Sequence, residues 1–298
     1  MAHAHAADFA LTPERIRELI VEFIGPFTLC FAGIGAIVAT QNDDLVVIGL
    51  AHGLAIGLMV AAAGHISGGA FNPAVTLGLL LANRITLGKA LSYIPVQLAG
   101  AVVGALAVKA AWPDADTDAV TLGVPTILED LRWGSAFIAE LIMTFFLMFV
   151  IFGVAVDSRG PRSIAGLAIG LTITMDIFLG GPLTGAAMNP ARAFGPALVQ
   201  NEWGDQWLYW VAPPLGAALA ACLYQYVLLP AGETLPDKLA EGDIHDVDGE
   251  RLTPHEKHAA TATIEAMDHV DMAAQSEEKR GEFDPIEPAE TTETEKPM

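Results

Sequence analysis

Basic residues are scarce in this sequence. The chain has 15 Lys and Arg against 35 Asp and Glu, which gives a formal net charge of −20. Nucleic-acid-binding proteins need a basic patch to neutralise phosphates, so this balance excludes a nucleic-acid partner. Cysteine is also rare, with only Cys30 and Cys222, both inside apolar stretches. Neither has a neighbour at metal-ligand spacing, so we expect two small buried residues and no metal site.

The residues of an enzyme site are missing as well. No nucleophile, base and orienting group occur together, and we therefore predict no catalytic residues, no enzymatic activity and no cofactor. The start of the chain, Met1–Pro13, lacks an apolar core followed by a cleavage site, so we expect no cleaved signal peptide.

Charge itself is sparse over most of the chain. Hydrophobic residues make up 53% and charged residues 17%. The charge is concentrated at one end, because residues 231–298 hold 19 acidic and 6 basic residues, a net of −13. Such a composition buries too little apolar surface to fold, so residues 230–298 are expected to form an acidic, disordered tail. The remainder reads as a membrane-embedded body.

Six stretches have the length and composition of a membrane-spanning helix. They are Ile16–Ala39, Leu45–Gly64, Ala90–Ala111, Trp133–Val156, Ile164–Gly180 and Trp207–Leu229. Two further apolar pieces, Val75–Leu81 and Ala193–Val199, are too short to cross a bilayer and predict re-entrant segments. The expected fold is an all-α membrane protein with six transmembrane helices and two re-entrant half-helices.

An internal repeat organises these segments. Glu22-Phe23-Ile24 returns as Glu140-Leu141-Ile142, and Asn72-Pro73-Ala74 returns as Asn189-Pro190-Ala191, at offsets of 118 and 117 residues. Each copy has three spans, so the second enters from the opposite side, which makes an inverted repeat. The expected boundaries are an N-terminal segment at 1–14, the repeats at 15–111 and 133–229, a connection at 112–132 and the tail at 230–298.

The even number of spans places both termini on one side. The connections on that side carry most of the basic residues, namely Arg15, Arg17, Arg84, Lys89, Arg159 and Arg162. The positive-inside rule therefore predicts cytoplasmic termini, an extracellular 112–132 connection and a multi-pass protein of the cell (inner or plasma) membrane. Glycine pairs four residues apart, such as Gly53/Gly57 and Gly166/Gly170, predict close helix contacts.

The two Asn-Pro-Ala triplets predict where two short helices begin. Asn caps free N–H groups and Pro fits a first helical turn, so Asn72-Pro73-Ala74 and Asn189-Pro190-Ala191 each suit a helix start. Two such starts at mid-membrane would point two positive helix ends at one spot. Irregular backbone survives there only where it is buried or lines a watery cavity. The carbonyl groups expected to line that cavity are those of Gly68, Gly69, Ala70, Phe71, Gly185 and Ala187.

Four ionisable residues need an explanation inside the membrane body. Glu22 and Glu140 are duplicated, which favours bracing of the pore loop of each repeat over a proton relay. His65 is interpreted as a third loop-bracing residue. Asp176 has no duplicate. We read it either as a carboxylate bonded to backbone or to another subunit, or as a polar residue that supports Ile177.

These motifs resemble the aquaporin, or major intrinsic protein, family. The likeness spans about Glu18–Leu229 and is most specific at Gly64–Thr76 and Gly185–Pro196. It implies a homotetramer in contact with membrane lipid, with one pore in each protomer. It also implies an outer selectivity filter that resembles the filter of tonoplast-type aquaporins and consists of His52, Ile177, Ala186 and Arg192. Such channels pass water, and many pass ammonia, urea or hydrogen peroxide, while ions and protons are excluded.

Other functions are consistent with parts of the pattern. Glycerol facilitators usually have Asp after the filter arginine, where this chain has Ala193, which favours the water-channel branch. A proton-coupled secondary transporter using Asp176, Glu22 and Glu140 would also suit an inverted repeat. A non-conducting junctional or scaffold protein would be insensitive to changes of Arg192.

Overall fold

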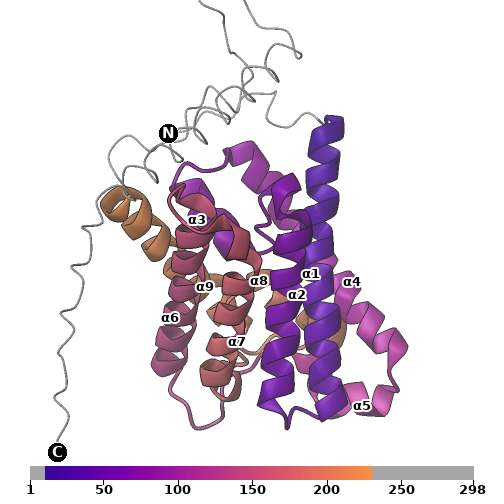
Figure 1. The fold of residues 1–298 in the computed structure, drawn as a ribbon. Coiled ribbons are helices and arrows are strands. Elements are labelled where there is room, and N and C mark those ends of the chain that lie inside the picture. Colours follow the sequence, from indigo (N-terminus) through magenta and orange to yellow (C-terminus); the bar gives the residue numbers. More distant parts are fainter. Residues whose placement is uncertain (1–10, 230–298) are drawn as a thin grey trace, which may run out of the picture. The chain divides into compact units, whose positions relative to one another are not determined.

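The structure is a computed structural model that describes residues 11–229. In that range all regular elements are helical (Figure 1). Six segments are long and apolar enough to cross a membrane, which confirms the six predicted spans. They are α1 (Pro13–Thr40), α2 (Leu45–Ser67), α4 (Leu87–Ala111), α6 (Trp133–Ile151, continued by π-helical Phe152–Val156), α7 (Ala165–Thr184, preceded by the 3-10 turn Arg162–Ile164) and α9 (Gln206–Leu223, continued by π-helical Tyr224–Leu228). The predicted acidic tail lies outside the described residues.

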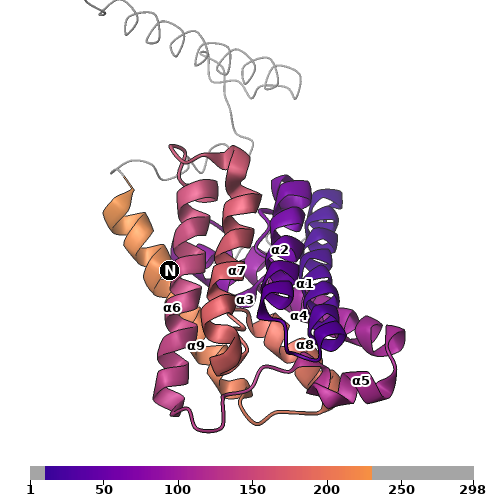
Figure 2. The ribbon, with the colours of Figure 1, turned by 60° about the horizontal axis from the view of Figure 1, so that its bottom comes forward.

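Two short helices complete the predicted architecture. They are α3 (Pro73–Leu81) and α8 (Pro190–Gln200), and Pro occupies the first turn of each. Both helices begin earlier than the apolar pieces predicted from the sequence. The N–H groups of a first helical turn have no partner within the helix, so Pro, which lacks an N–H, is tolerated there. In Figures 1 and 2 they lie among the long helices, and each contacts both α4 and α9.

Two long helices extend further than expected. α2 runs past Gly64 to Ser67, and α7 runs past Gly180 to Thr184. The next residue ends each helix in the left-handed conformation, Gly68 with φ 93° and Gly185 with φ 76°. Glycine adopts this conformation without the penalty that a Cβ atom brings, so it forms a favourable helix end.

The two repeats pack in equivalent ways. α1 packs against α4 in the first repeat as α6 packs against α9 in the second, and α2 packs against α7 between the repeats. Glycines make these contacts close, as predicted. A Cβ atom on Gly57 would lie 2.7 Å from the Gly166 oxygen, and one on Gly104 would lie 2.5 Å from the Phe27 oxygen of α1. The arrangement is an inverted repeat with backbones in near contact.

We call the side where α1 begins and α9 ends the terminal side, and the opposite side the far side. The connection 112–132 on the far side contains a short helix, α5 (Asp114–Ala119), and a 3-10 turn at Thr121–Gly123. The sequence analysis expected only a connection here, because six residues are too few for a helical pattern to show. Asp114 and Asp116 lie in the first turn of α5, where acidic side chains complement the helix dipole.

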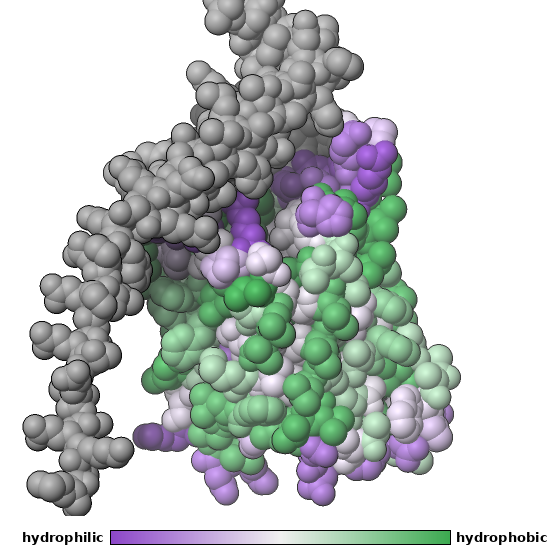
Figure 3. Space-filling view, viewed as in Figure 1, coloured by the Kyte–Doolittle hydropathy of each residue, from purple (hydrophilic) through white to green (hydrophobic). Residues whose placement is uncertain are grey.

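The outer surface of the helices is apolar. Figure 3 shows hydrophobic side chains over the middle of one face and hydrophilic side chains towards its ends. Large side chains that would be buried in a soluble protein are exposed on α2, α6 and α7, among them Leu58 (60%), Ile138 (59%) and Leu167 (61%). The body is that of an integral, multi-pass membrane protein.

Candidate functional site

The two predicted asparagines cap the two half-helices. The side-chain oxygen of Asn72 accepts a hydrogen bond from the Ala74 N–H at 2.8 Å. The oxygen of Asn189 accepts from the Ala191 N–H at 2.9 Å and from the Arg192 N–H at 3.3 Å. The sequence folds locally as predicted, since Asn favours an N-cap and Pro the position after it.

Each asparagine also reaches across to the other repeat. The Nδ2 atom of Asn72 donates to the Met188 carbonyl at 2.9 Å, and Nδ2 of Asn189 donates to the Phe71 carbonyl at 3.0 Å. These reciprocal bonds join the N-termini of α3 and α8 inside the protein, where both asparagines are 4% exposed. Each NH₂ group has a second hydrogen for another acceptor.

The loops before the half-helices are sharply bent. Phe71, Ala186 and Met188 have positive φ angles of 50°, 42° and 51°. Residues with a Cβ atom rarely adopt this conformation, and it persists only where surrounding contacts fix it. The loops therefore depend on the side chains that hold them.

Glu22 holds the first loop. Its carboxylate accepts from the Ala70 N–H at 3.0 Å, from the Phe71 N–H at 2.8 Å and from the Ser67 hydroxyl at 2.6 Å. Gln97 of α4 adds a fourth donor, Nε2, at 2.8 Å. The geometry of the predicted brace is thus present, with every donor close enough for a strong bond.

Glu140 holds the second loop in an equivalent way. Its carboxylate accepts from the Ala187 N–H at 2.9 Å, from the Met188 N–H at 2.9 Å and from the Thr184 hydroxyl at 2.6 Å. Gly100 of α4 and Gly216 of α9 are 116 residues apart and make equivalent contacts, with the Phe23 and Leu141 carbonyls. At the same offset Gln97 corresponds to Pro213, which has no donor to offer. Glu140 therefore has one donor fewer than Glu22.

His65 does not occupy the bracing position expected of it. Its side chain is exposed, and no hydrogen bond of His65 is found within residues 11–229. The hydroxyls of Ser67 and Thr184 make the bracing contacts instead. The sequence held a signal for this pair, because the two residues are separated by the same 117 residues as Asn72 and Asn189.

A cavity of about 600 Å³ opens at the far side. Three of the four predicted filter residues line it, namely His52, Ile177 and Arg192. Ala186 is not in its lining, although the neighbouring Gly185 is. The rest of the wall comes largely from the connections at the ends of the spans, including Asn42, Asp43, Val120, Thr121 and residues 123–126.

Arg192 and His52 give this cavity its polar groups. The Nη1 atom of Arg192 donates to the Gly123 carbonyl at 2.9 Å, while Nε has no partner within the described range. His52 makes its bond through Nδ1, 2.8 Å from the Ile48 carbonyl. A carbonyl only accepts, so Nδ1 is the donor, and Nε2 of the neutral ring is left as an acceptor. The ring packs directly against Gly33.

Asp176 is buried and lacks the partners expected of it. The side chain is 2% exposed, and its Oδ2 atom finds no hydrogen-bond partner among residues 11–229. It precedes Ile177 on α7, but it does not line the far-side cavity. Because it is enclosed within a single chain, the structure gives no support to a bond with another subunit.

The same part of the chain contains no group of three or more His, Cys, Asp or Glu residues that could hold a metal ion. The site is therefore described by hydrogen-bond donors, carbonyl groups and one buried guanidinium.

Comparisons with known proteins place these features in context. The family described as "Major intrinsic protein" matches residues 10–224. A "Probable aquaporin TIP3-2" of Arabidopsis thaliana is 40% identical over 241 residues, which are 76% of this chain and 88% of the relative. A "Probable aquaporin TIP-type alpha" of Phaseolus vulgaris is 41% identical over 75% of this chain and 90% of the relative.

More distant proteins agree with these two. Mouse "Aquaporin-5" is 38% identical over 75% of this chain and 85% of its own length. The X-ray structure of the aquaglyceroporin from Plasmodium falciparum superposes with a TM-score of 0.66 and 27% identity, covering 72% of this chain and 98% of that one. Sequence and fold thus point to the same group of proteins.

Proposed function

The chain belongs to the major intrinsic protein family and is a channel for water and small solutes, and we propose that its filter admits small neutral molecules while it excludes ions and protons. The proposed filter consists of His52, Ile177, Ala186 and Arg192. The solutes expected besides water are ammonia, urea and hydrogen peroxide.

One observation carries the proposal: the far-side cavity combines a donor and an acceptor on residues of the predicted filter. Arg192 brings a cationic donor group to the cavity wall, and His52 brings a ring whose Nε2 makes no hydrogen bond among the described residues, while Ile177 supplies an apolar wall. A neutral molecule that both donates and accepts can replace its water contacts there. Ile177 is too short and too apolar to close the passage as a histidine would, which supports a filter wider than one for water alone.

Ion exclusion follows from the charges along the proposed path. Arg192 is a buried cation at the filter, and the N-termini of α3 and α8 direct two positive helix ends at the middle of the protein. Cations meet a positive barrier at both places. The second hydrogens of Asn72 and Asn189 remain to orient a passing oxygen, and we assign the carbonyl file to Gly68, Gly69, Ala70, Phe71, Gly185 and Ala187.

A transporter with titrating acids has less support. Glu22 and Glu140 each hold two backbone N–H groups and a hydroxyl, and these contacts fix strained loops. A proton relay through either residue would release its loop during each cycle. A passive file between two fixed half-helices fits these contacts better.

The wider assembly is also part of the proposal. Basic residues at the terminal side, such as Arg17, Lys89 and Arg162, support cytoplasmic termini in a cell membrane. The family resemblance supports a homotetramer with one pore per protomer. Native mass measurement of the purified protein would test the tetramer.

The decisive experiment is stopped-flow swelling and shrinkage of proteoliposomes that contain the full chain. Water, urea, glycerol and ammonia are compared for the parent, for Ile177→His and for the matched control Ile177→Val. We expect fast water flux in all three and loss of urea flux only in Ile177→His, because histidine narrows the filter. Parent vesicles no more permeable to water than empty ones would refute the proposed function.

A further inference from the structure

We propose that Tyr93 and Tyr209 are positioning residues that hold the two pore loops together with the glutamates, and that the pore depends more strongly on Tyr209. The inference rests on the proposed function, because the loops in question carry the proposed carbonyl file and the filter residue Ala186. It assigns a role in the pore loops to two tyrosines that the sequence analysis did not connect with those loops.

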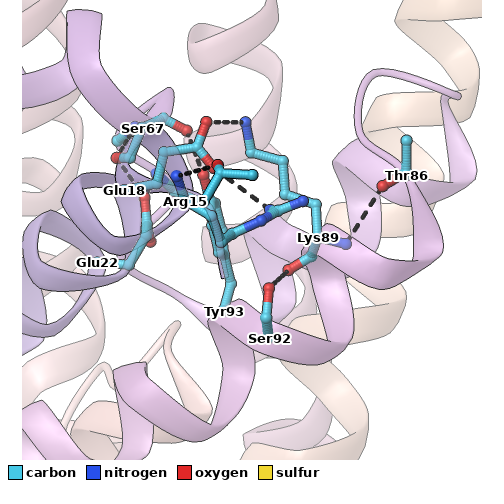
Figure 4. A network of polar contacts seen from close by, with 11 residues as sticks. Arg15, Glu18, Glu22, Ser67, Thr86, Lys89, Ser92 and Tyr93 are labelled. Carbon is cyan, nitrogen blue, oxygen red and sulfur yellow. Dashed lines mark hydrogen bonds and ion pairs between the residues drawn. The ribbon is translucent and has the colours of Figure 1, made fainter. Parts of the chain in front are cut away.

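Tyr93 acts on the first loop. It lies on α4, is 1% exposed, and its hydroxyl donates to the Ser67 carbonyl at 2.8 Å. The Ser67 hydroxyl meanwhile donates to Glu22 and accepts from the Gly69 N–H at 3.0 Å. Figure 4 shows Tyr93 beside Ser67 and Glu22. Ser67 is thereby held through its backbone from α4 and through its side chain from α1.

Charged residues at the terminal side pack on this tyrosine. Lys89 lies 5.4 Å from the centre of the Tyr93 ring, and its Nζ atom is 2.8 Å from a carboxylate oxygen of Glu18 (Figure 4). An ion pair thus packs on the ring of Tyr93.

Tyr209 repeats the arrangement in the second loop. It lies on α9 and is fully buried, and its hydroxyl donates to the Thr184 carbonyl at 2.6 Å. The Thr184 hydroxyl donates to Glu140 and accepts from the Ala186 N–H at 3.2 Å. Tyr93 and Tyr209 are separated by 116 residues, close to the offset of the Asn-Pro-Ala motifs. Two equivalent clamps therefore exist, each made by the third span of its repeat.

The two carbonyls that accept from the tyrosines, those of Ser67 and Thr184, lie where each pore loop begins. Ser67 and Thr184 are the last residues of α2 and α7, immediately before the glycines that turn the chain into each loop. Each of these carbonyls already accepts a hydrogen bond from a tyrosine, and the proposed file of exposed carbonyls begins after it. In the second loop the filter residue Ala186 follows two positions later, and Arg192 lies in the first turn of the half-helix beyond it.

The clamps are unequal because of one residue. Gln97 gives Glu22 a fourth donor and also bonds Thr76 of α3 at 3.0 Å, so the first loop has support that does not pass through Tyr93. Pro213 at the corresponding position offers Glu140 nothing. Loss of the Tyr209 hydroxyl should therefore displace its loop more than loss of the Tyr93 hydroxyl displaces the other.

The test compares Tyr93→Phe, Tyr209→Phe and the control Tyr226→Phe in proteoliposomes. Tyr226 is 61% exposed at the terminal side, where its hydroxyl bonds the Leu81 carbonyl rather than a pore loop. The readout is the ratio of urea to water permeability, which a general loss of folded protein leaves unchanged. We expect the ratio to change by about two- to ten-fold in Tyr209→Phe, less in Tyr93→Phe and not in Tyr226→Phe.

A second comparison, made in the Gln97→Leu variant, tests the difference between the two loops even if Tyr209→Phe fails to fold. Removing the extra donor with Gln97→Leu should enlarge the effect of Tyr93→Phe on the ratio by about two-fold or more. A conducting parent with unchanged ratios in both Phe variants would overturn the inference, as would an additive Gln97→Leu/Tyr93→Phe pair. A parent that conducts nothing would instead reject the proposed function, so the two failures are distinct.

Discussion

Replacement of Glu140 by Gln offers a direct measure of how firmly the second pore loop is held. The carboxylate accepts three hydrogen bonds through two oxygens, and a glutamine side chain keeps only one of those oxygens as an acceptor. In one orientation of the glutamine, its NH₂ group faces the Met188 N–H. In the other orientation, it faces the Thr184 hydroxyl and the Ala187 N–H. At least one buried N–H loses its acceptor in either orientation.

The expected magnitude follows from these contacts. A hydrogen bond to a charged group contributes about 1.5–3 kcal/mol, and a buried donor left unpaired costs about as much. We therefore expect Glu140→Gln to reduce the free energy of unfolding by about 3 kcal/mol. For a body of this size that corresponds to a fall in melting temperature of roughly 6–12 °C.

Thermal unfolding of the purified protein in detergent would measure the effect, with Glu18→Gln as the control. Glu18 is also paired, with Lys89 at 2.8 Å and Arg15 at 3.3 Å, but its side chain is 20% exposed, and such ion pairs contribute about 1 kcal/mol or less. Equal falls in melting temperature for the two variants would refute the reasoning, since burial and strained neighbours would then add nothing.

Three further predictions test other parts of the structure. Arg192→Val should raise cation leak by ~30-fold, because one positive charge ~8 Å away opposes a cation by about 2 kcal/mol at an effective dielectric of ~20; vesicle ion-flux assays would measure it. Asp176→Asn should keep water permeability within about two-fold of the parent, and complete loss together with pH-gradient dependence in the parent would favour a transporter. The Arg159 guanidinium, 2.7 Å away, holds the pKa of the Asp157 carboxyl well below its usual range. The stabilisation is full at neutral pH and fades as pH falls below ~4 towards that depressed pKa, so the lower melting temperature of Asp157→Asn should converge with the parent's in acid.

The sequence predicted the elements that carry a local signal. Long apolar runs located the six spans, and Asn followed by Pro located the starts of α3 and α8. The repeat offset then related the two halves. These features depend on composition and on neighbouring residues, so a single chain reveals them.

Contacts between distant residues left weaker signals. The Gly123 carbonyl that binds Arg192 is 69 residues away, in a turn where Leu122 has a φ of 48°, and no spacing in the sequence indicates either fact. The role expected of His65 belongs to Ser67, two residues later and on the inner face of α2. One helical turn contains both residues, and only the packing of α1 and α4 decides which of them is buried.

The reciprocal asparagine bonds have a consequence for how the protein is made. Asn72 needs the Met188 carbonyl and Asn189 needs the Phe71 carbonyl, partners 116 and 118 residues apart. The first pore loop therefore cannot be completed until the second has left the ribosome and entered the bilayer. Until then, neither Asn72 at the N-terminus of α3 nor the Phe71 carbonyl in the first loop has its hydrogen-bond partner from the second half. The contacts that join the two halves of this channel can therefore form only late in biogenesis.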